Sequence, residues 1–142
     1  MISKKDHKFL NLALNESLKS PLKNKHGCVA TINGKVIAKG YNHERTQISF
    51  LNQKIFSCHA EIDTIRKIDS KKIKKIKLYI VRTNRNGEFK NSSPCIDCFN
   101  YIKKVKQLIY TKNKNSILKC KPEQYHHIHY CQGRKVLNYY QF

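Results

Sequence analysis

Two short segments constrain this chain most, because their side chains act together only if the fold brings them to one point. The first is His59-Ala60-Glu61, and the second is Pro94-Cys95-Ile96-Asp97-Cys98. Together they supply one imidazole and two thiols, a ligand set that zinc binds in proteins. Three protein ligands leave the fourth position of a tetrahedral zinc ion to water, as in catalytic sites. The pattern therefore predicts one catalytic zinc ion held by His59, Cys95 and Cys98.

Glu61 follows the predicted histidine ligand closely, at the start of a predicted helix. From that place its carboxylate can face the fourth position of the ion, take a proton from the water there and pass it to a substrate. Zinc lowers the pKa of its water from about 15.7 toward 7, which makes water a nucleophile at neutral pH. A structural zinc site needs no such glutamate. Glu61 is therefore the predicted catalytic residue, and a structural Cys-x-x-Cys knuckle beside an incidental His-x-Glu is the alternative.

The chain has 142 residues, which suits a single domain covering residues 1–142. No apolar run with a cleavage site opens the sequence, and no apolar stretch is long enough to span a bilayer. We therefore expect a soluble cytoplasmic protein without a membrane partner, whose six cysteines stay reduced.

The charge of the chain is strongly positive, at +20 from 29 Lys and Arg against 9 Asp and Glu. A chain this basic favours anionic partners, which include phosphorylated nucleotides, RNA and DNA. The densest basic run, 71–77, could follow a phosphate backbone, although the favoured interpretation is a solvated connection. Arg82 and Arg85 leave a predicted strand at its carboxyl end, where ligands usually bind, and are better candidates for a substrate phosphate. His26 and His43 flank a predicted hairpin and could approach the same phosphate.

Hydrophobic periodicity and turn residues divide the chain into alternating helices and strands. The opening helix ends before Pro21, and Asn33-Gly34 joins the first two strands in a tight hairpin. Residues 42–53 are predicted to form a polar connection, and residues 113–142 have no clean period. Helices are predicted at residues 6–18, 60–68 and 96–105, and strands at residues 28–32, 35–39, 77–82 and 107–111. This alternation predicts a three-layer α/β domain.

These residues and their order resemble the cytidine and deoxycytidylate (CMP/dCMP-type) zinc-dependent deaminase superfamily. The signature H-x-E followed by P-C-x-x-C is that of zinc-dependent nucleobase deaminases, and the resemblance extends from Gly27 to about Thr111. It implies an α/β/α sandwich of the cytidine-deaminase type around a mixed sheet of about five strands. It also implies hydrolytic loss of an amino group from a base, and self-association into a homo-oligomer.

The resemblance also implies three substrate contacts. Asn42 matches the asparagine that hydrogen-bonds the substrate in nucleotide and tRNA deaminases. Ala60 matches the backbone N–H that meets the base carbonyl, and Ser93 matches the backbone carbonyl that receives the exocyclic amine. Residues 62–64 lack the asparagine typical of deoxycytidylate deaminases, while Ser93-Pro94-Cys95 resembles the polynucleotide cytidine deaminases. The identity of the substrate therefore stays open.

The predicted function is deamination of a cytosine base to uracil with release of ammonia, on a free nucleotide or nucleoside. A deaminase of adenosine or cytidine in tRNA or single-stranded nucleic acid comes second, because the charge favours it and the lack of an aromatic stacking series disfavours it. A zinc-stabilised RNA-binding protein without turnover is the alternative of a different class, and Glu61 argues against it.

A second cluster of possible metal ligands lies near the C-terminal end. Its spacing matches no standard zinc pattern, so ordinary packing or surface contact is the favoured interpretation and a second ion is not expected. The cluster consists of His126, His127, His129 and Cys131, with Cys120 nearby.

Overall fold

The structure of the chain, a computed structural model, describes residues 2–50 and 53–125. The elements in chain order are α1 (Lys4–Ser17), β1 (Lys25–Ile32), β2 (Lys35–Tyr41), β3 (His43–Phe50), β4 (Gln53–Cys58), α2 (Ala60–Ile65), η1 (Ser70–Lys75), β5 (Lys77–Thr83), β6 (Phe89–Lys90), α3 (Ile96–Ile102), β7 (Gln107–Asn113), β8 (Ser116–Cys120) and η2 (Pro122–Gln124). Six strands form the main sheet in the order β2-β1-β5-β7-β8, with β6 paired to β5.

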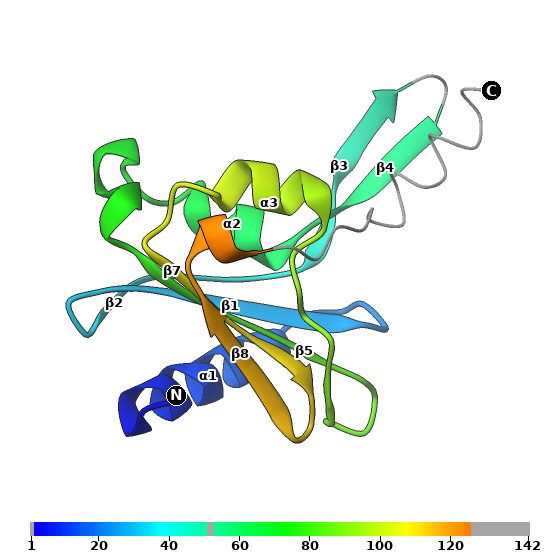
Figure 1. Cartoon of the computed structure of the whole chain (residues 1–142). Helices are drawn as coiled ribbons and strands as arrows, with labels where there is room; N and C mark the ends of the chain where they lie inside the picture. The colour runs from blue at the N-terminus through cyan, green and yellow to red at the C-terminus, as the bar shows by residue number, and fades with distance from the viewer. Residues whose placement is uncertain (1, 51–52, 126–142) are drawn as a thin grey trace.

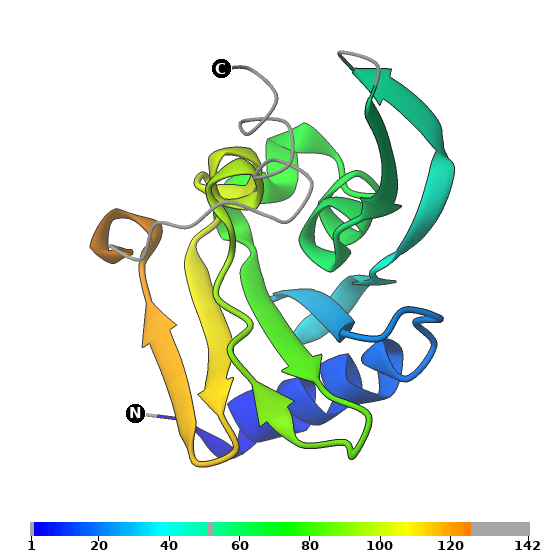
Figure 2. The ribbon, with the colours of Figure 1, turned by 90° about the vertical axis from the view of Figure 1, so that its right-hand side faces the viewer.

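The sheet is mixed and covered on both faces. Strands β5 and β7 run parallel, whereas the β1–β2, β1–β5 and β7–β8 pairs are antiparallel. Helix α1 lies on one face, and α2 and α3 lie on the other (Figure 1). The view turned by 90° shows the same layers from the side of β5, β7 and β8 (Figure 2). The predicted three-layer α/β/α sandwich with a mixed sheet is confirmed.

Helix α1 begins where its sequence can satisfy the first N–H groups. Ser3 caps the helix by accepting a hydrogen bond from the Asp6 N–H at 3.1 Å, and the Asp6 carboxylate accepts one from the Ser3 N–H at 3.1 Å. Phe9, Leu10 and Ala13 then form a buried cluster with residues of β1, β5 and β7. The predicted helix at 6–18 is confirmed, with the start moved to Lys4 by this cap.

Two close backbone approaches position the strands that precede the site. At the predicted hairpin turn, Asn33 and Gly34 have φ angles of 50° and 77°, so the turn prediction is confirmed. Further along β2, a Cβ added to Gly40 would lie 2.4 Å from Thr64 Oγ1. Only glycine therefore allows β2 to lie this close to α2, the helix that follows His59.

The predicted polar connection at 42–53 is wrong. Strands β3 and β4 occupy this region and form a separate antiparallel pair beside the main sheet (Figures 1 and 2). The segment contains the β-favouring residues Thr46, Ile48 and Phe50 among charged ones. The polar residues between them break the alternation that predicts a strand. A two-stranded ladder can still form here, because its backbone groups pair with each other and need no fully apolar face.

Other differences concern the ends of elements and the last described strand. Helices α2 and α3 end at Ile65 and Ile102, before the predicted 68 and 105, and β8 was not predicted. Strand β8 is a half-exposed edge strand, whose place depends on pairing with β7 and not on a local apolar pattern. The histidines and Cys131 of the second cluster lie outside the described residues. No helix within residues 2–50 and 53–125 is long and apolar enough to cross a membrane.

Candidate metal centre

The predicted ligands meet at the starts of two helices on one face of the sheet. His59 is the N-cap residue of α2, and Cys95 is the N-cap residue of α3, where its Sγ accepts a hydrogen bond from the Cys98 N–H at 3.5 Å. His59 Nδ1 lies 2.9 Å from Cys98 Sγ and 3.7 Å from Cys95 Sγ. The structure therefore brings one imidazole nitrogen and two sulfurs together from segments far apart in the sequence.

The geometry of these atoms suits a tetrahedral zinc ion. The three ligand atoms all lie within 4.8 Å of one another. Zinc–ligand bonds of the usual lengths place a nitrogen and a sulfur ligand about 3.6 Å apart. The Cys95–His59 distance matches this separation, and the shorter Cys98–His59 contact has to open slightly around an ion. Among residues 2–50 and 53–125, this is the one group of three or more metal-ligating side chains.

Glu61 lies in the first turn of α2, beside the three ligands, and is only 4% exposed. Burial raises the pKa of its carboxyl group, and the nearby His59 opposes this effect only in part. One of its oxygens, Oε1, is buried and has no hydrogen-bond partner among the described residues. A buried carboxyl group with an uncommitted oxygen is suited to taking up and giving back a proton.

Two of the residues assigned by the resemblance flank the ligands. Ala60 is fully buried and is the first residue of α2, so its N–H has no partner within the helix. The Ser93 N–H donates to Asn91 Oδ1 at 2.9 Å, while the buried Ser93 Oγ has no hydrogen-bond partner in the described part of the chain. Ala60 follows the predicted ligand His59, and Ser93 lies two residues before the predicted ligand Cys95. Their contacts with a substrate stay predictions.

The side chain of Asn42 is buried and contacts two backbone groups. Its side-chain oxygen accepts a hydrogen bond from the His26 N–H at 2.8 Å, and its NH₂ group donates to the Asn24 carbonyl at 2.7 Å. The amide thus holds the backbone of the segment at the start of β1. An amide has a second N–H and a second lone pair, so a substrate contact stays a prediction that this bracing does not exclude.

The predicted phosphate contacts differ in charge. Burial, and then the charge of Arg82, lower the pKa of His26 to about 3, so that this imidazole is neutral at pH 7. Arg82 is half-buried, its guanidinium lies 3.5 Å from the Asn91 carbonyl, and its Nε has no partner among the residues that the structure describes. His43 Nδ1 lies 3.0 Å from the Tyr41 carbonyl oxygen, and Arg85 is exposed. Arg82 is therefore a half-buried cation whose charge acts on His26.

Sequence reasoning missed the residues that hold the segment before Cys95. Ser92 and Thr111 are both buried, and Ser92 bonds β5 and β7 together ahead of Cys95. The Ser92 hydroxyl donates to the Ile80 carbonyl at 2.9 Å and accepts from the Thr111 N–H at 2.8 Å. The backbone N–H of Ser92 donates to the Thr111 carbonyl at 2.8 Å. No local motif marks this pair, because the contact exists only once β5 and β7 are side by side.

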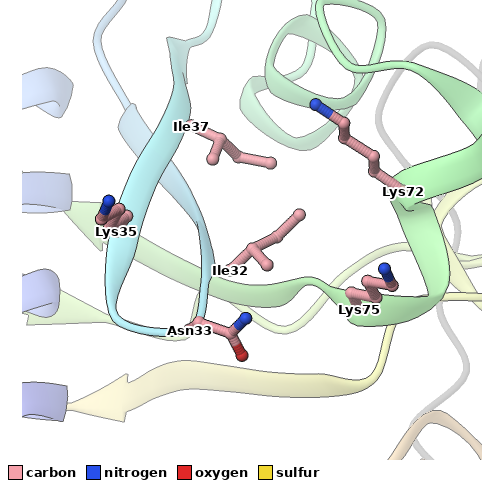
Figure 3. A pocket seen from close by; sticks show the side chains of 6 residues that line it. All are labelled: Ile32, Asn33, Lys35, Ile37, Lys72 and Lys75. Atoms are coloured by element: carbon pink, nitrogen blue, oxygen red, sulfur yellow. The ribbon is translucent and has the colours of Figure 1, made fainter.

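A pocket of about 330 Å³ lies elsewhere, between the β1–β2 hairpin and η1. Ile32 and Ile37 point into it from the hairpin, and Lys72 reaches it from η1 (Figure 3). The strand register places Thr31, next to Ile32, opposite Lys77 at the start of β5, whereas Ser92, which leads into the ligand segment, bonds Ile80 further along that strand. This basic pocket is therefore separate from the candidate metal centre. The 3₁₀ helix η1 contains most of the basic run, and none of its residues is buried.

The sequence model of the cytidine and deoxycytidylate deaminase zinc-binding region matches residues 3–112. The chain therefore belongs to this family, as the resemblance predicted. No curated protein matches the chain in sequence.

Solved structures show the same fold. A dCMP deaminase from the cyanophage S-TIM5 in apo form is 20% identical, with a TM-score of 0.59, and the match covers 98% of this chain and 94% of that one. A cytidine deaminase from Burkholderia pseudomallei is 15% identical, with a TM-score of 0.60 and coverage of 82% and 91%. The cyanophage protein in complex with dCMP and dUMP is 22% identical, with a TM-score of 0.55 and coverage of 78% and 82%.

Proposed function

We propose that the chain is a zinc-dependent hydrolase that converts a cytosine base to uracil and releases ammonia, acting on a free nucleotide or nucleoside. The observation that carries this proposal is Glu61, a buried carboxyl group beside three metal-ligating side chains with Oε1 uncommitted. A structural zinc site gains nothing from this arrangement, because burying a carboxylate without full hydrogen bonding costs free energy.

Each residue of the site would have its own role in this reaction. His59, Cys95 and Cys98 would hold zinc, which when bound makes a water molecule acidic enough to attack the base at neutral pH. Glu61 would take one proton of that water at Oε1 and pass it to the ring nitrogen, and then take the second proton, from the hydroxyl added to the base, and pass it to the amine, which leaves as ammonia. The Ala60 N–H and the Ser93 carbonyl would orient the base by contacting its carbonyl and its amine. Asn42 would orient the sugar side of the substrate.

Deoxycytidylate is the first substrate to test. The cyanophage structure described with dCMP and dUMP shares this fold, and Arg82 provides a partly buried cation near the site for a single phosphate. Its Nε has no hydrogen-bond partner among the described residues. A guanidinium with an unused N–H binds phosphate oxygens readily.

A polynucleotide substrate is the second candidate, and the charge of +20 is the observation that favours it. Each Lys or Arg that neutralises a phosphate releases a counterion, so the logarithm of affinity falls with the logarithm of salt concentration by roughly 0.7 per contact for single strands. Binding of a short strand to the Glu61→Gln protein that vanishes near physiological salt would exclude this candidate. A steep slope with tight binding at that salt would support it.

A substrate panel tests the proposed function directly. Released ammonia is measured with cytidine, deoxycytidine, deoxycytidylate, adenosine, tRNA and oligonucleotides, using the wild type and the Glu61→Gln variant as a matched control. Turnover of a cytosine mononucleotide or nucleoside by the wild type alone supports the proposal. Turnover restricted to tRNA or oligonucleotides would replace it with the second candidate, and no turnover by metal-loaded protein would favour a zinc-stabilised binding protein.

We also propose a reducing cellular location and self-association. The described cysteines Cys28, Cys95, Cys98 and Cys120 form no disulfide, which suits the cytoplasm. Light scattering across a range of protein concentrations tests the predicted homo-oligomer.

A further inference from the structure

Tyr125 reaches the ligand segment from a distant part of the chain. It follows η2, after the last described strand, and its hydroxyl donates a hydrogen bond to the Pro94 carbonyl at 2.5 Å. That carbonyl belongs to the peptide bond that joins Pro94 to Cys95. The contact therefore acts on the backbone directly between the predicted amine acceptor, Ser93, and a metal ligand.

The ring of Tyr125 is fixed on two sides. It stacks on Phe99 with ring centroids 4.8 Å apart and an interplanar angle of 20°, and Phe99 is the residue after the ligand Cys98. The Tyr110 ring meets it edge-on at 5.9 Å. Aromatic pairs at such distances and angles are favourable arrangements. The ring that carries the hydroxyl to Pro94 therefore also packs on α3, the helix that contains Cys98.

The direction of the hydrogen bond is unambiguous. A carbonyl oxygen only accepts, and Pro94 has no N–H that could compete for the hydroxyl. Burial raises the pKa of Tyr125, so its hydroxyl keeps its proton at neutral pH. Pro94 is buried, so a Pro94 carbonyl deprived of this donor would lose a partner that water cannot easily replace.

We propose that Tyr125 is a positioning residue that fixes the Ser93–Cys95 backbone, aligning the Cys95 thiolate for the metal and the Ser93 carbonyl for the departing amine. The Ser92–Thr111 pair holds this segment against β5 and β7, and Tyr125 holds it two residues later. The metal part of this proposal stands on its own, and the amine part rests on the proposed function.

The test compares Tyr125→Phe with Tyr110→Phe. Tyr125→Phe keeps the ring and removes the hydroxyl that contacts Pro94. Tyr110 is the matched control, because its ring belongs to the same cluster while its hydroxyl makes no hydrogen bond within the described residues. Zinc affinity is measured by competition with a chelator, and the ligand geometry is followed in Co²⁺-loaded protein by its absorption spectrum.

We expect Tyr125→Phe to lower zinc affinity by about tenfold, as loss of a contact that orients a ligand does, and to shift the Co²⁺ spectrum. The turnover number should also fall by about tenfold with little change in KM, because the amine is tetrahedral only on the reaction path. The melting temperature should fall somewhat more than in Tyr110→Phe, because the Pro94 carbonyl loses its donor. A Tyr125→Phe protein whose zinc affinity and Co²⁺ spectrum equal those of Tyr110→Phe would overturn the proposal.

Tyr125→Leu adds a second arm, since it removes the ring together with the hydroxyl. If only this variant changes the metal readouts, the ring packs on α3 and the hydroxyl has no positioning role, which also overturns the proposal. The metal readouts do not depend on turnover. A wild type that binds zinc but deaminates no base would therefore refute the proposed function, while the comparison of zinc affinities still decides the role of Tyr125.

Discussion

Asp6 and Glu61 are both buried carboxylates in the first turn of a helix, on opposite faces of the sheet, but their surroundings differ. Asp6, 2% exposed, accepts hydrogen bonds from the Tyr79 hydroxyl at 2.7 Å and the Lys119 ammonium at 2.9 Å, besides its cap contact with Ser3. Glu61, 4% exposed, keeps one oxygen without a partner in the described part of the chain. The Asp6 carboxylate is therefore engaged in hydrogen bonds that stabilise the fold, whereas one oxygen of Glu61 stays available for proton transfer.

The same difference is visible in the direction of the two pKa shifts. Burial alone would raise the pKa of Asp6, but the hydrogen bonds from Tyr79 and Lys119 lower it well below its usual range. At Glu61 burial prevails, and the pKa is raised. Asp6 is therefore a permanent anion that stabilises the fold, whereas the raised pKa of Glu61 suits a group that takes up and releases a proton.

Substitution at Glu61 should have the largest effect on activity. Glu61→Gln preserves the shape of the side chain but cannot carry a proton, so turnover should fall by about 10²–10⁴-fold or more. Zinc content should be unchanged, and stability should be equal or higher because a buried carboxyl group is removed. Ammonia release and elemental analysis on one preparation test both points. Retained turnover would mean that another group moves the proton.

Substitution at Asp6 should give the opposite pattern. Asp6→Asn leaves the Lys119 ammonium and the Tyr79 hydroxyl with a weaker partner, so the free energy of unfolding should fall by about 2–3 kcal/mol. Because the pKa of Asp6 is lowered by folding, the difference from wild type should shrink as the pH falls below about 4. Urea denaturation measures both effects. Turnover per folded chain should not change. A loss of turnover as large as that of Glu61→Gln would contradict the purely structural role of Asp6.

His26 should have a smaller effect than Asp6 or Glu61, on how the stability of the fold depends on pH. The folded protein keeps His26 neutral down to a pKa of about 3, whereas the unfolded chain binds a proton below about pH 6.5. Stability from this residue is therefore present above that pH and decreases as the pH falls toward 3, by up to about 1.4 kcal/mol per pH unit. Urea denaturation of wild type and His26→Gln at pH 7.5 and 5.5 tests this slope. Parallel slopes would show that another group causes it.

The grouping of His59, Cys95 and Cys98 could be predicted from sequence, because their identities and spacing are local properties of two helix starts. His59 and Glu61 share one turn, and so do Cys95 and Cys98. The hairpin at Asn33-Gly34 and the starts of α2 and α3 were predictable for the same reason. Ser92, Tyr125 and Lys119 could not be found in this way, because each acts on a residue that only the folded sheet brings near. Strands β3, β4 and β8 were missed because pairing, not an apolar pattern, defines them.

The zinc content of the purified wild type, measured by elemental analysis together with ammonia release from the same sample, tests the central claim most directly. One zinc per chain is expected, and Cys95→Ser, prepared in parallel, should lose most of it along with activity. Two zinc ions per chain would point to a second site outside the described residues and correct the expected number. A folded protein that is active without bound metal would contradict the account.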